Sequence, residues 1–439
     1  MKKTICLFLV IITISARAQV VFSTFISGLP LPVGFTIAPD GRFFIACKGY
    51  APSYPSIIKT YDAAGTFQNN LWDFTDSTET AGEKGVLGVC TDLNFNANHY
   101  VYVFYNHLSP ASIRVVRFTE VSGVGTSPQV ILNLPDAFSA SYHTGGNIHV
   151  RPGDPGHLYI SIGDKGVGAD AQDTTRWNGK MLRIGTDGSI PTDNPFYDDG
   201  NPATGHDDRI WVMGLRNSFD FTFSGMNDSL YATENGVSAF DELNMLEKGK
   251  NYGWPLCEGV SGTCTGFEVP LDVFGAAVPA LTGIIIYTGT IMPEITNHAL
   301  IVDYNNGKIT DVVLGNAPVY DQVVSRTPLP GTGFLNLTDI EQGIDECVYV
   351  CEINAGKISK ICDVTSVYEF AEKNTFAIYP NPVKTELTIE GSVEAVKLYT
   401  AHGSVLSETR SNKLDVSALE PGFYVVLVNG IHAFKFLKE

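Results

Sequence analysis

The chain has 439 residues, of which 44% are hydrophobic and 17% charged, a balance typical of a folded core rather than of a disordered or coiled-coil protein. The 43 glycines and 23 prolines predict many turns. The formal net charge of −18 would repel a phosphate backbone, so we expect no nucleic-acid partner and favour uncharged substrates or cations.

Residues 1–18 have the three-part pattern of a secretory signal peptide. Lys2 and Lys3 precede the apolar run from Ile5 to Ile14, and Ala16-Arg17-Ala18 forms a cleavage site of the Ala-x-Ala type before Gln19. A membrane anchor is the alternative, but this run is too short to cross a hydrocarbon core of roughly 30 Å. No later segment is long and apolar enough to span a membrane either, so we expect no transmembrane segment in the mature chain.

Seven cysteines remain once the signal is removed, and an oxidising compartment would let them pair. Cys257 and Cys264 flank a glycine-rich loop and form the first predicted bridge. A hairpin turning at Asn354-Ala355 would place Cys347 opposite Cys362 and leave Cys351 free. The sequence contains no C-x-x-C pair, and the spacing of its cysteines does not suggest a zinc site.

Residues 19–363 consist of short apolar runs separated by turns, and this pattern shows almost no helical periodicity. Examples of the runs are FTIA, RFFIAC, YVYVFY, RVVRFT, HLYISIG and ALIVDY. Such a series of antiparallel hairpins predicts an all-β fold, and radial repetition of four-stranded blades is one way to protect the strand edges. Six blades of roughly 57 residues would fit, and seven would also fit.

The texture changes after Cys362, where residues 364–373 read as a linker and 374–439 as a small, separate β-sandwich. Tyr-Pro-Asn-Pro at 379–382 and Leu-x-x-Gly-x-Tyr at 419–424 occur before a basic tail. The segment resembles the C-terminal sorting domain of the type IX secretion system. The resemblance implies export by that machinery, followed by release or by anchoring at the outer cell surface. A sugar-binding sandwich is the alternative.

Three polar segments interrupt the strand-and-turn texture and carry a possible active site. His143 lies beside paired glycines, Asp164 follows a strand, and Arg216 lies in the stretch GLRN. Each alone is more often structural. Together they could form a catalytic group, because a carboxylate that is hydrogen-bonded to one ring nitrogen of a histidine fixes the tautomer of the ring and raises its basicity. A guanidinium supplies a permanent cation for a developing oxyanion or a carboxylate.

These segments, in this order, resemble the soluble quinoprotein glucose dehydrogenases, the glucose/sorbosone dehydrogenase family, over about residues 30–360. The resemblance implies a six-bladed propeller that binds pyrroloquinoline quinone and calcium on its axial face and oxidises aldose sugars. The stretches that carry it are LPVGFTIAPDGRFFIA, GEKGVLGVCTDLNFNANHYVYVFY, HTGGNIHVRPGDPGHLYISIGDKG, GKMLRIGTDGSIPTDNPF, MGLRNSFDFTF and ENGVSAFDELNMLEKGKNYGWP.

By position, the resemblance implies that His143 is the general base, that Asp164 orients it, and that Arg216 polarises the quinone carbonyl with Asn217 beside it. An external electron acceptor would then reoxidise the cofactor.

The resemblance also implies that backbone carbonyls of Gly236 and Val237 hold the cofactor's calcium. It further implies that Glu242 is a ligand of the family's structural calcium sites, for which a solvated loop acid is the alternative. The family usually has proline where Val237 stands, which is tolerable because only a carbonyl is needed.

The family's basic contacts to the three cofactor carboxylates are missing. The corresponding stretches, 303–307 and 334–339, contain no lysine or arginine, and Glu83 replaces the family's glutamine. Each lost charge-assisted contact can cost roughly 1.5–3 kcal/mol. The sequence therefore predicts weak quinone binding unless another basic residue reaches the site. The candidates are Lys84, Lys165 and Arg209.

Three functions remain open from the sequence. The first is a secreted sugar dehydrogenase that uses pyrroloquinoline quinone and calcium. The second is a non-catalytic cell-surface binding propeller that has lost the quinone site, which the missing basic contacts favour. The third is a calcium-dependent lactonase-type hydrolase, which would need acidic and amide side chains converging on the axis, with Asp164, Asn217 and Glu234 as candidates.

Overall fold

The computed structural model describes residues 21–439 except 238, 276–278, 330–332, 364–376, 392, 401–404 and 430–431. The chain divides into two compact units, Met1–Ser366 and Val367–Glu439. The expected signal peptide at 1–18 and linker at 364–373 lie outside the described residues. Within the described part, no helix has the length and apolar character needed to cross a membrane.

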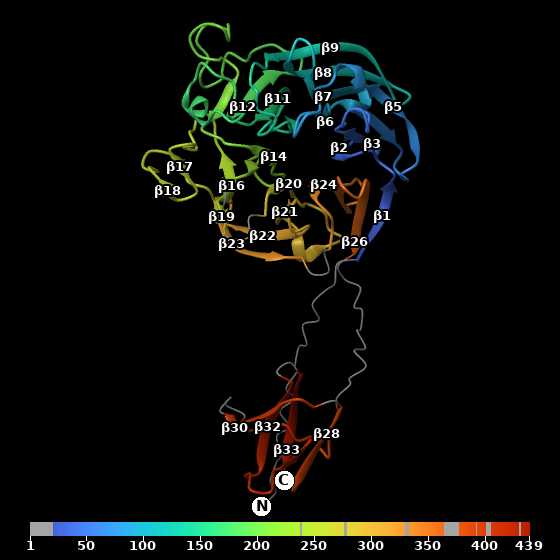
Figure 1. The fold of residues 1–439 in the computed structure, drawn as a ribbon, viewed down its shortest axis with the longest axis vertical. Coiled ribbons are helices and arrows are strands. Elements are labelled where there is room, and N and C mark those ends of the chain that lie inside the picture. Colours follow the sequence, from blue (N-terminus) through green and yellow to red (C-terminus); the bar gives the residue numbers. More distant parts are fainter. Residues whose placement is uncertain are drawn as a thin grey trace, which may run out of the picture. The chain divides into compact units, whose positions relative to one another are not determined.

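The described part of the first unit contains six four-stranded antiparallel sheets, arranged around a ring (Figure 1). In sheet order they comprise β2 (Pro32–Ile37), β3 (Phe43–Cys47), β4 (Ile57–Tyr61) and β5 (Phe67–Asp73); β6 (Val86–Thr91), β7 (Tyr100–His107), β8 (Ser112–Val121) and β9 (Val124–Pro135); β10 (Ile148–Arg151), β11 (Asp154–Ile162), β12 (Lys180–Gly185) and β13 (Ile210–Met213); β14 (Ser218–Phe223), β15 (Leu230–Glu234), β16 (Asp241–Leu246) and β19 (Asp272–Phe274); β20 (Leu281–Ile286), β21 (Ala299–Asp303), β22 (Ile309–Gly315) and β23 (Gln322–Pro328); and β24 (Leu337–Gln342), β25 (Val348–Glu352), β26 (Lys357–Asp363) and β1 (Val21–Ser27).

Short elements occur in the connections between these strands. They are the ribbon β17 (Cys257–Glu258) and β18 (Ser261–Gly262), the helical turn α1 (Phe95–Asn98), and the 3₁₀ turns η1 (Thr75–Ser77), η2 (Gly168–Gln172) and η3 (Pro293–Ile295). The all-β expectation is confirmed by this content.

Burial changes with the position of a strand in its sheet. The third-sheet strand β12 and the fifth-sheet strand β21 are buried along their whole length, because a neighbouring sheet covers each face. The outermost strands β5 and β23 are mostly exposed and rich in polar residues. Polar outer strands limit pairing with other chains at the sheet edges.

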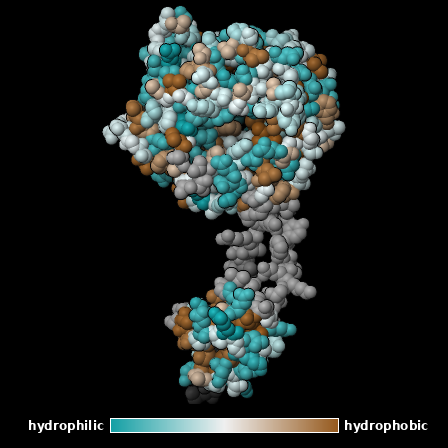
Figure 2. Space-filling view, viewed as in Figure 1, coloured by the Kyte–Doolittle hydropathy of each residue, from teal (hydrophilic) through white to brown (hydrophobic). Residues whose placement is uncertain are grey.

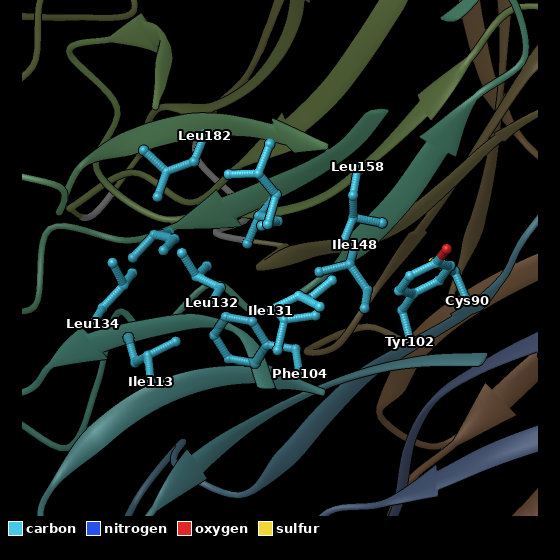
Figure 3. Close-up of a cluster of buried hydrophobic side chains, with 14 of the residues drawn as sticks. Cys90, Tyr102, Phe104, Ile113, Ile131, Leu132, Leu134, Ile148, Leu158 and Leu182 are labelled. Atoms are coloured by element: carbon cyan, nitrogen blue, oxygen red, sulfur yellow. The ribbon is translucent and has the colours of Figure 1, made fainter. Parts of the chain in front are cut away.

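A separate hydrophobic cluster lies between each pair of neighbouring sheets. Figure 3 shows the one between the second and third sheets, where Tyr102 and Phe104 of β7 meet Ile148 and Leu158 of the next sheet. Five similar clusters join the remaining neighbours. One of these, which contains Phe43 and Tyr349, packs the sixth sheet against the first, so the ring closes through apolar contacts.

Buried aspartates also join sheets near the axis. Asp220 on β14 accepts a hydrogen bond from the backbone N–H of Ile284 in the fifth sheet, at 2.8 Å. Asp339 on β24 accepts one from Phe35 in the first sheet, at 2.7 Å. These carboxylates satisfy donors that the inner strands leave unpaired within their own sheets.

The strand nearest the N-terminus completes the last sheet, since β1 pairs antiparallel with β26. Next to it, Cys351 pairs with Ile358 across the β25–β26 hairpin, which is the predicted register. The predicted Cys347–Cys362 disulfide forms, Cys351 is free, and the second predicted bridge joins Cys257 to Cys264.

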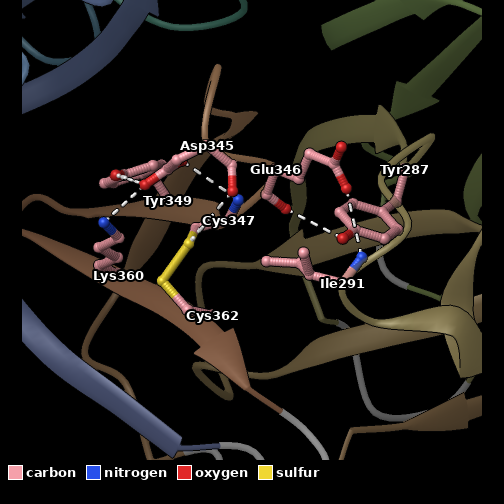
Figure 4. The surroundings of a disulfide bond; sticks show 8 residues. All are labelled: Tyr287, Ile291, Asp345, Glu346, Cys347, Tyr349, Lys360 and Cys362. Carbon is pink, nitrogen blue, oxygen red and sulfur yellow. Dashed lines mark hydrogen bonds and ion pairs between the residues drawn. A yellow bond between two sulfur atoms is a disulfide. The ribbon is translucent and has the colours of Figure 1, made fainter.

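A polar group surrounds the Cys347–Cys362 bond (Figure 4). Asp345 accepts a hydrogen bond from the Tyr349 hydroxyl at 2.9 Å and pairs with Lys360 at 2.6 Å. Burial alone would raise the pKa of Asp345, but these contacts outweigh it and hold the pKa below its ordinary value.

The second unit has two sheets that share one core, formed by side chains such as Leu387, Leu398, Val426 and Phe436. The three-stranded sheet contains β27 (Ala377–Tyr379), β28 (Glu386–Glu390) and β31 (Lys413–Asp415). The four-stranded sheet contains β29 (Val396–Thr400), β30 (Val405–Thr409), β32 (Gly422–Val428) and β33 (His432–Lys438).

Candidate active site

His143 and Asp164 meet at the end of the third sheet. His143 lies in the connection from β9 to β10, where its φ of 52° places the backbone in the left-handed region, and Asp164 follows β11. The Nδ1 of His143 lies 2.7 Å from Oδ1 of Asp164. An ionised carboxylate only accepts, so Nδ1 carries the shared proton, and in the neutral form of the ring the lone pair is on Nε2.

Asp164 is buried and held by three donors. Its Oδ1 also accepts the backbone N–H of Gly166 at 2.8 Å, and its Oδ2 accepts the indole N–H of Trp254 at 2.8 Å. Burial alone would raise the pKa of Asp164, but the hydrogen bonds from His143, Gly166 and Trp254 hold the pKa below its ordinary value. The carboxylate therefore stays ionised beside the imidazole.

Arg216 joins the same group through Trp254. The guanidinium carbon of Arg216 lies 5.4 Å from the centre of the Trp254 ring, and the Arg216 carbonyl accepts the backbone N–H of Asp164 at 2.7 Å. Its Nη1 donates to the carbonyls of Asn235 and Gly236 at 2.8 and 2.9 Å. Its Nε is buried and has no hydrogen-bond partner. The guanidinium therefore has hydrogen-bonding capacity that its contacts within the protein do not use.

The other cofactor residues expected from the sequence lie next to this group. The Oδ1 of Asn217 accepts the backbone N–H of Gly145 at 3.2 Å, which connects the Arg216 segment to the His143 loop. The carbonyl of Gly236 already accepts from Arg216. The backbone N–H of Val237 donates to Glu258, and the Val237 side chain is exposed.

Glu242 borders a small cavity of about 10 Å³ that Arg216, Glu234, Gly236 and Glu258 also line. Burial, together with the neighbouring glutamate charges, raises the pKa of both Glu234 and Glu242. Three carboxylates thus surround a space large enough for about one small ion or water. Carboxylates and carbonyls are the ligands that calcium prefers, so this donor set fits a calcium ion.

A larger cavity of about 380 Å³ lies on the axis of the ring. Every sheet contributes to its wall through the first strand that faces the centre, or through the residue before that strand, and Figure 2 shows this face of the unit hollowed near its centre. One lining residue from each sheet, in order, is Gly34, Leu87, Asn147, Phe219, Thr282 and Asp339.

Two glycines in the cavity wall have no room for a side chain. A Cβ at Gly34 would lie 2.7 Å from the carbonyl oxygen of Leu87, and one at Gly145 would lie 2.7 Å from that of Ser161. Gly145 and Asn217 line the cavity and directly flank the His143 and Arg216 segments. The backbone segments that carry His143 and Arg216 therefore border the axial cavity, although neither side chain is among the residues that line it.

Lys48 is the basic residue among the described side chains that line this cavity. It is only 9% exposed, and its Nζ donates to the carbonyls of Thr80 at 3.2 Å and Gly49 at 3.4 Å. In the described chain no carboxylate lies within ion-pair distance of this ammonium. Burial lowers the pKa of Lys48, and the charges of Glu83 and Glu79 oppose that shift.

The basic residues named from the sequence lie elsewhere. Lys84 and Lys165 both pair with Asp136, at 3.3 and 3.5 Å. Arg209 pairs with Asp207 at 2.6 Å. Sequence reasoning missed Lys48 because a lysine at the end of a strand carries no motif. It also missed Trp254, whose indole is part of the quoted stretch GKNYGWP but was given no role.

Most of the chain matches a known protein family. The family model described as glucose/sorbosone dehydrogenase matches residues 29–360. The chain belongs to this family. A second model, the secretion system C-terminal sorting domain, matches residues 377–436, so the protein is exported by type IX secretion and is released or attached at the outer surface.

Two curated relatives are dehydrogenases. The aldose sugar dehydrogenase YliI of Escherichia coli is 28% identical over 43% of this chain and 50% of its own length. Quinoprotein glucose dehydrogenase B of Acinetobacter calcoaceticus is 28% identical over 53% of this chain and 52% of its own. The matched part thus spans about half the length of these relatives.

The fold agrees with solved structures over a longer stretch. The PQQ-bound aldose sugar dehydrogenase of Streptomyces coelicolor has a TM-score of 0.63 at 23% identity, covering 79% of this chain and 98% of that one. The apo aldose sugar dehydrogenase of Escherichia coli has a TM-score of 0.68 at 22% identity, covering 78% and 99%.

Proposed function

We propose that this protein is an exported quinoprotein dehydrogenase that oxidises an aldose sugar, or a related alcohol or aldehyde, with pyrroloquinoline quinone and calcium. The single observation that carries the proposal is the 2.7 Å contact between Nδ1 of His143 and Asp164. In the neutral imidazole this contact leaves Nε2 as the ring nitrogen that can accept a proton. The closed series of six four-stranded sheets supports the six-bladed propeller expected for such an enzyme, and the paired sheets of the second unit support a sandwich.

The residues present fit the quinone. Its carboxylates and carbonyls need cationic and N–H donors, and the chain offers the partnerless Nε of Arg216 and the Lys48 ammonium, which lacks a carboxylate partner. Burial raises the pKa of Asp339 well above its ordinary value, which reduces the negative charge that this wall residue would bring to the cavity. Gly236, Val237 and Glu242 would hold calcium.

When bound, the quinone would accept the hydride that leaves the sugar carbon and pass its electrons to an external acceptor. His143 takes the hydroxyl proton on Nε2. Asp164 keeps Nδ1 protonated and stabilises the imidazolium that forms, because it is a fixed carboxylate with low pKa. Arg216, held in place by Trp254 and by two backbone carbonyls, would supply positive charge beside the quinone when it is bound.

A second candidate is a non-catalytic binding propeller on the cell surface. The observation that favours it is the scarcity of cations around the cavity, where Lys48 is the basic residue among the described lining side chains and Glu83 is an opposing acid. For a lactonase-type hydrolase the support is weaker. Of its three candidate residues, Asn217 lines the axial cavity, whereas Asp164 is committed to His143 and Trp254.

Reconstitution of the full chain separates these functions. The protein is freed of cofactors and given the quinone and calcium, and reduction of an artificial dye is followed with a panel of aldoses. We expect saturable quinone binding, seen as quenching of tryptophan fluorescence, and sugar-dependent dye reduction. If the protein shows no quinone binding and no dye reduction, the dehydrogenase proposal is wrong. Lactone opening with calcium alone would favour the hydrolase.

A further inference from the structure

Three aspartates converge in the long connection between β12 and β13, away from the residues assigned above. One carboxylate oxygen from each of Asp198, Asp199 and Asp208 lies within 4.8 Å of the other two. Asp198 and Asp199 are exposed, whereas Asp208 is fully buried. The nearby arginines pair with other acids, Arg183 with Asp193 and Arg209 with Asp207, both within 2.8 Å.

Asp208 is the member that points to a ligand. Its Oδ1 accepts the backbone N–H of Asp198 at 2.7 Å, and its own carbonyl accepts from Nδ2 of Asn194 at 2.8 Å, so its position is fixed. Its Oδ2 is buried and has no hydrogen-bond partner. A buried carboxylate oxygen without a donor is costly, because the group has given up water without replacing it. A cation in contact with this oxygen would remove that cost.

The two exposed aspartates are also held in place. Oδ2 of Asp198 accepts the backbone N–H of His206 at 2.9 Å. Asp199 accepts the backbone N–H of Asn201 at 2.8 Å and the Thr204 hydroxyl at 2.6 Å. Neutral N–H and O–H donors therefore fix the orientation of each carboxylate. Within the described residues, none of the three has a Lys, Arg or His partner at ion-pair distance. Like charges this close repel unless a positive charge lies among them.

We propose that Asp198, Asp199 and Asp208 bind a calcium ion that ties the connection to the start of β13. Calcium takes six to eight oxygen ligands in flexible geometry, and the exposed side of Asp198 and Asp199 leaves room for water to complete the set. The ion would join one end of the connection to the segment that enters β13 and then runs to Arg216. This site is separate from the one proposed at Glu242.

Calcium binding to the full-length protein tests the proposal. The metal-free chain is titrated with calcium by equilibrium dialysis, for the wild type and for Asp199→Asn, an exposed change that leaves the buried Asp208 intact. Asp76→Asn, at an exposed acid of the first sheet's connection, is the matched control. We expect Asp199→Asn to lose one bound calcium, or at least tenfold in affinity for it, and Asp76→Asn to match the wild type.

Two further measurements keep the result unambiguous. Glu242→Gln should lose a different calcium, so that its effect and that of Asp199→Asn add. Terbium added without calcium should emit when tyrosine is excited, because Tyr197 precedes Asp198, and Tyr197→Phe should dim this emission. Equal calcium number and affinity in Asp199→Asn and wild type, or terbium emission indifferent to Tyr197, would overturn the site. Quinone binding is read separately, so failure of the dehydrogenase proposal would not imitate either result.

Discussion

Trp254 connects the two halves of the candidate active site, because one side chain serves both. Its N–H donates to Asp164, and its ring lies beside the Arg216 guanidinium. The sequence placed His143, Asp164 and Arg216 together through their chemistry and order. It could not identify Trp254, since a tryptophan after a turn is usually packing and only the fold brings it 90 residues back to Asp164.

Trp254→Phe keeps the ring and removes the indole N–H. The loss of one donor should raise the pKa of Asp164 toward its ordinary value, so the ionised carboxylate would be lost at a higher pH as the solution is acidified. We expect kcat to fall about tenfold, the cost of roughly one hydrogen bond to a charged group, and the acid limb of its pH profile to move upward. An unchanged pH profile with unchanged kcat would show that Trp254 does not position Asp164.

Lys48 lines the axial cavity and is our candidate to replace the missing basic contacts to the cofactor carboxylates. Lys48→Met keeps most of the side-chain volume and removes the charge, so we expect the dissociation constant of the quinone to rise at least tenfold, as for loss of one charge-assisted contact of about 1.5 kcal/mol. Fluorescence titration measures it, with the exposed Lys384→Met as control. Equal quinone affinity in Lys48→Met and wild type would place the cofactor carboxylates elsewhere.

At the scale of elements, local pairing was predictable and distant pairing was not. The β25–β26 hairpin follows from a turn at Asn354-Ala355, and the register of that turn also predicts the Cys347–Cys362 bridge. The pairing of β1 with β26 joins residues more than 300 positions apart and has no local signal in either strand. The inter-sheet contact from Asp339 to Phe35 was missed for the same reason.

The Cys347–Cys362 bridge should contribute measurably to stability. Replacing both cysteines with serine frees a 15-residue segment in the unfolded state, and chain entropy predicts a loss of about 3 kcal/mol in the free energy of unfolding. Urea unfolding at neutral pH measures it. The same double change at Cys257 and Cys264, which close only a 7-residue segment, should cost less. The reverse order would contradict this account.

At the scale of the whole molecule, the sequence left six and seven blades open, because the repeats are irregular and strand length alone does not count sheets. The structure has six four-stranded sheets in its described first unit, with six hydrophobic clusters between neighbours. Closure leaves an axial cavity lined by every sheet, and the His143 and Arg216 segments meet beside it. The sorting domain has its own core and carries the export signal.

The most direct test of the dehydrogenase proposal is His143→Gln in the reconstituted protein, with quinone binding and sugar-dependent dye reduction measured on the same samples. Glutamine can still donate a hydrogen bond to Asp164 but cannot take a proton. We predict quinone affinity within about twofold of wild type and dye reduction at least 100-fold slower, the usual range for loss of a general base. Dye reduction at the wild-type rate in His143→Gln would contradict the account.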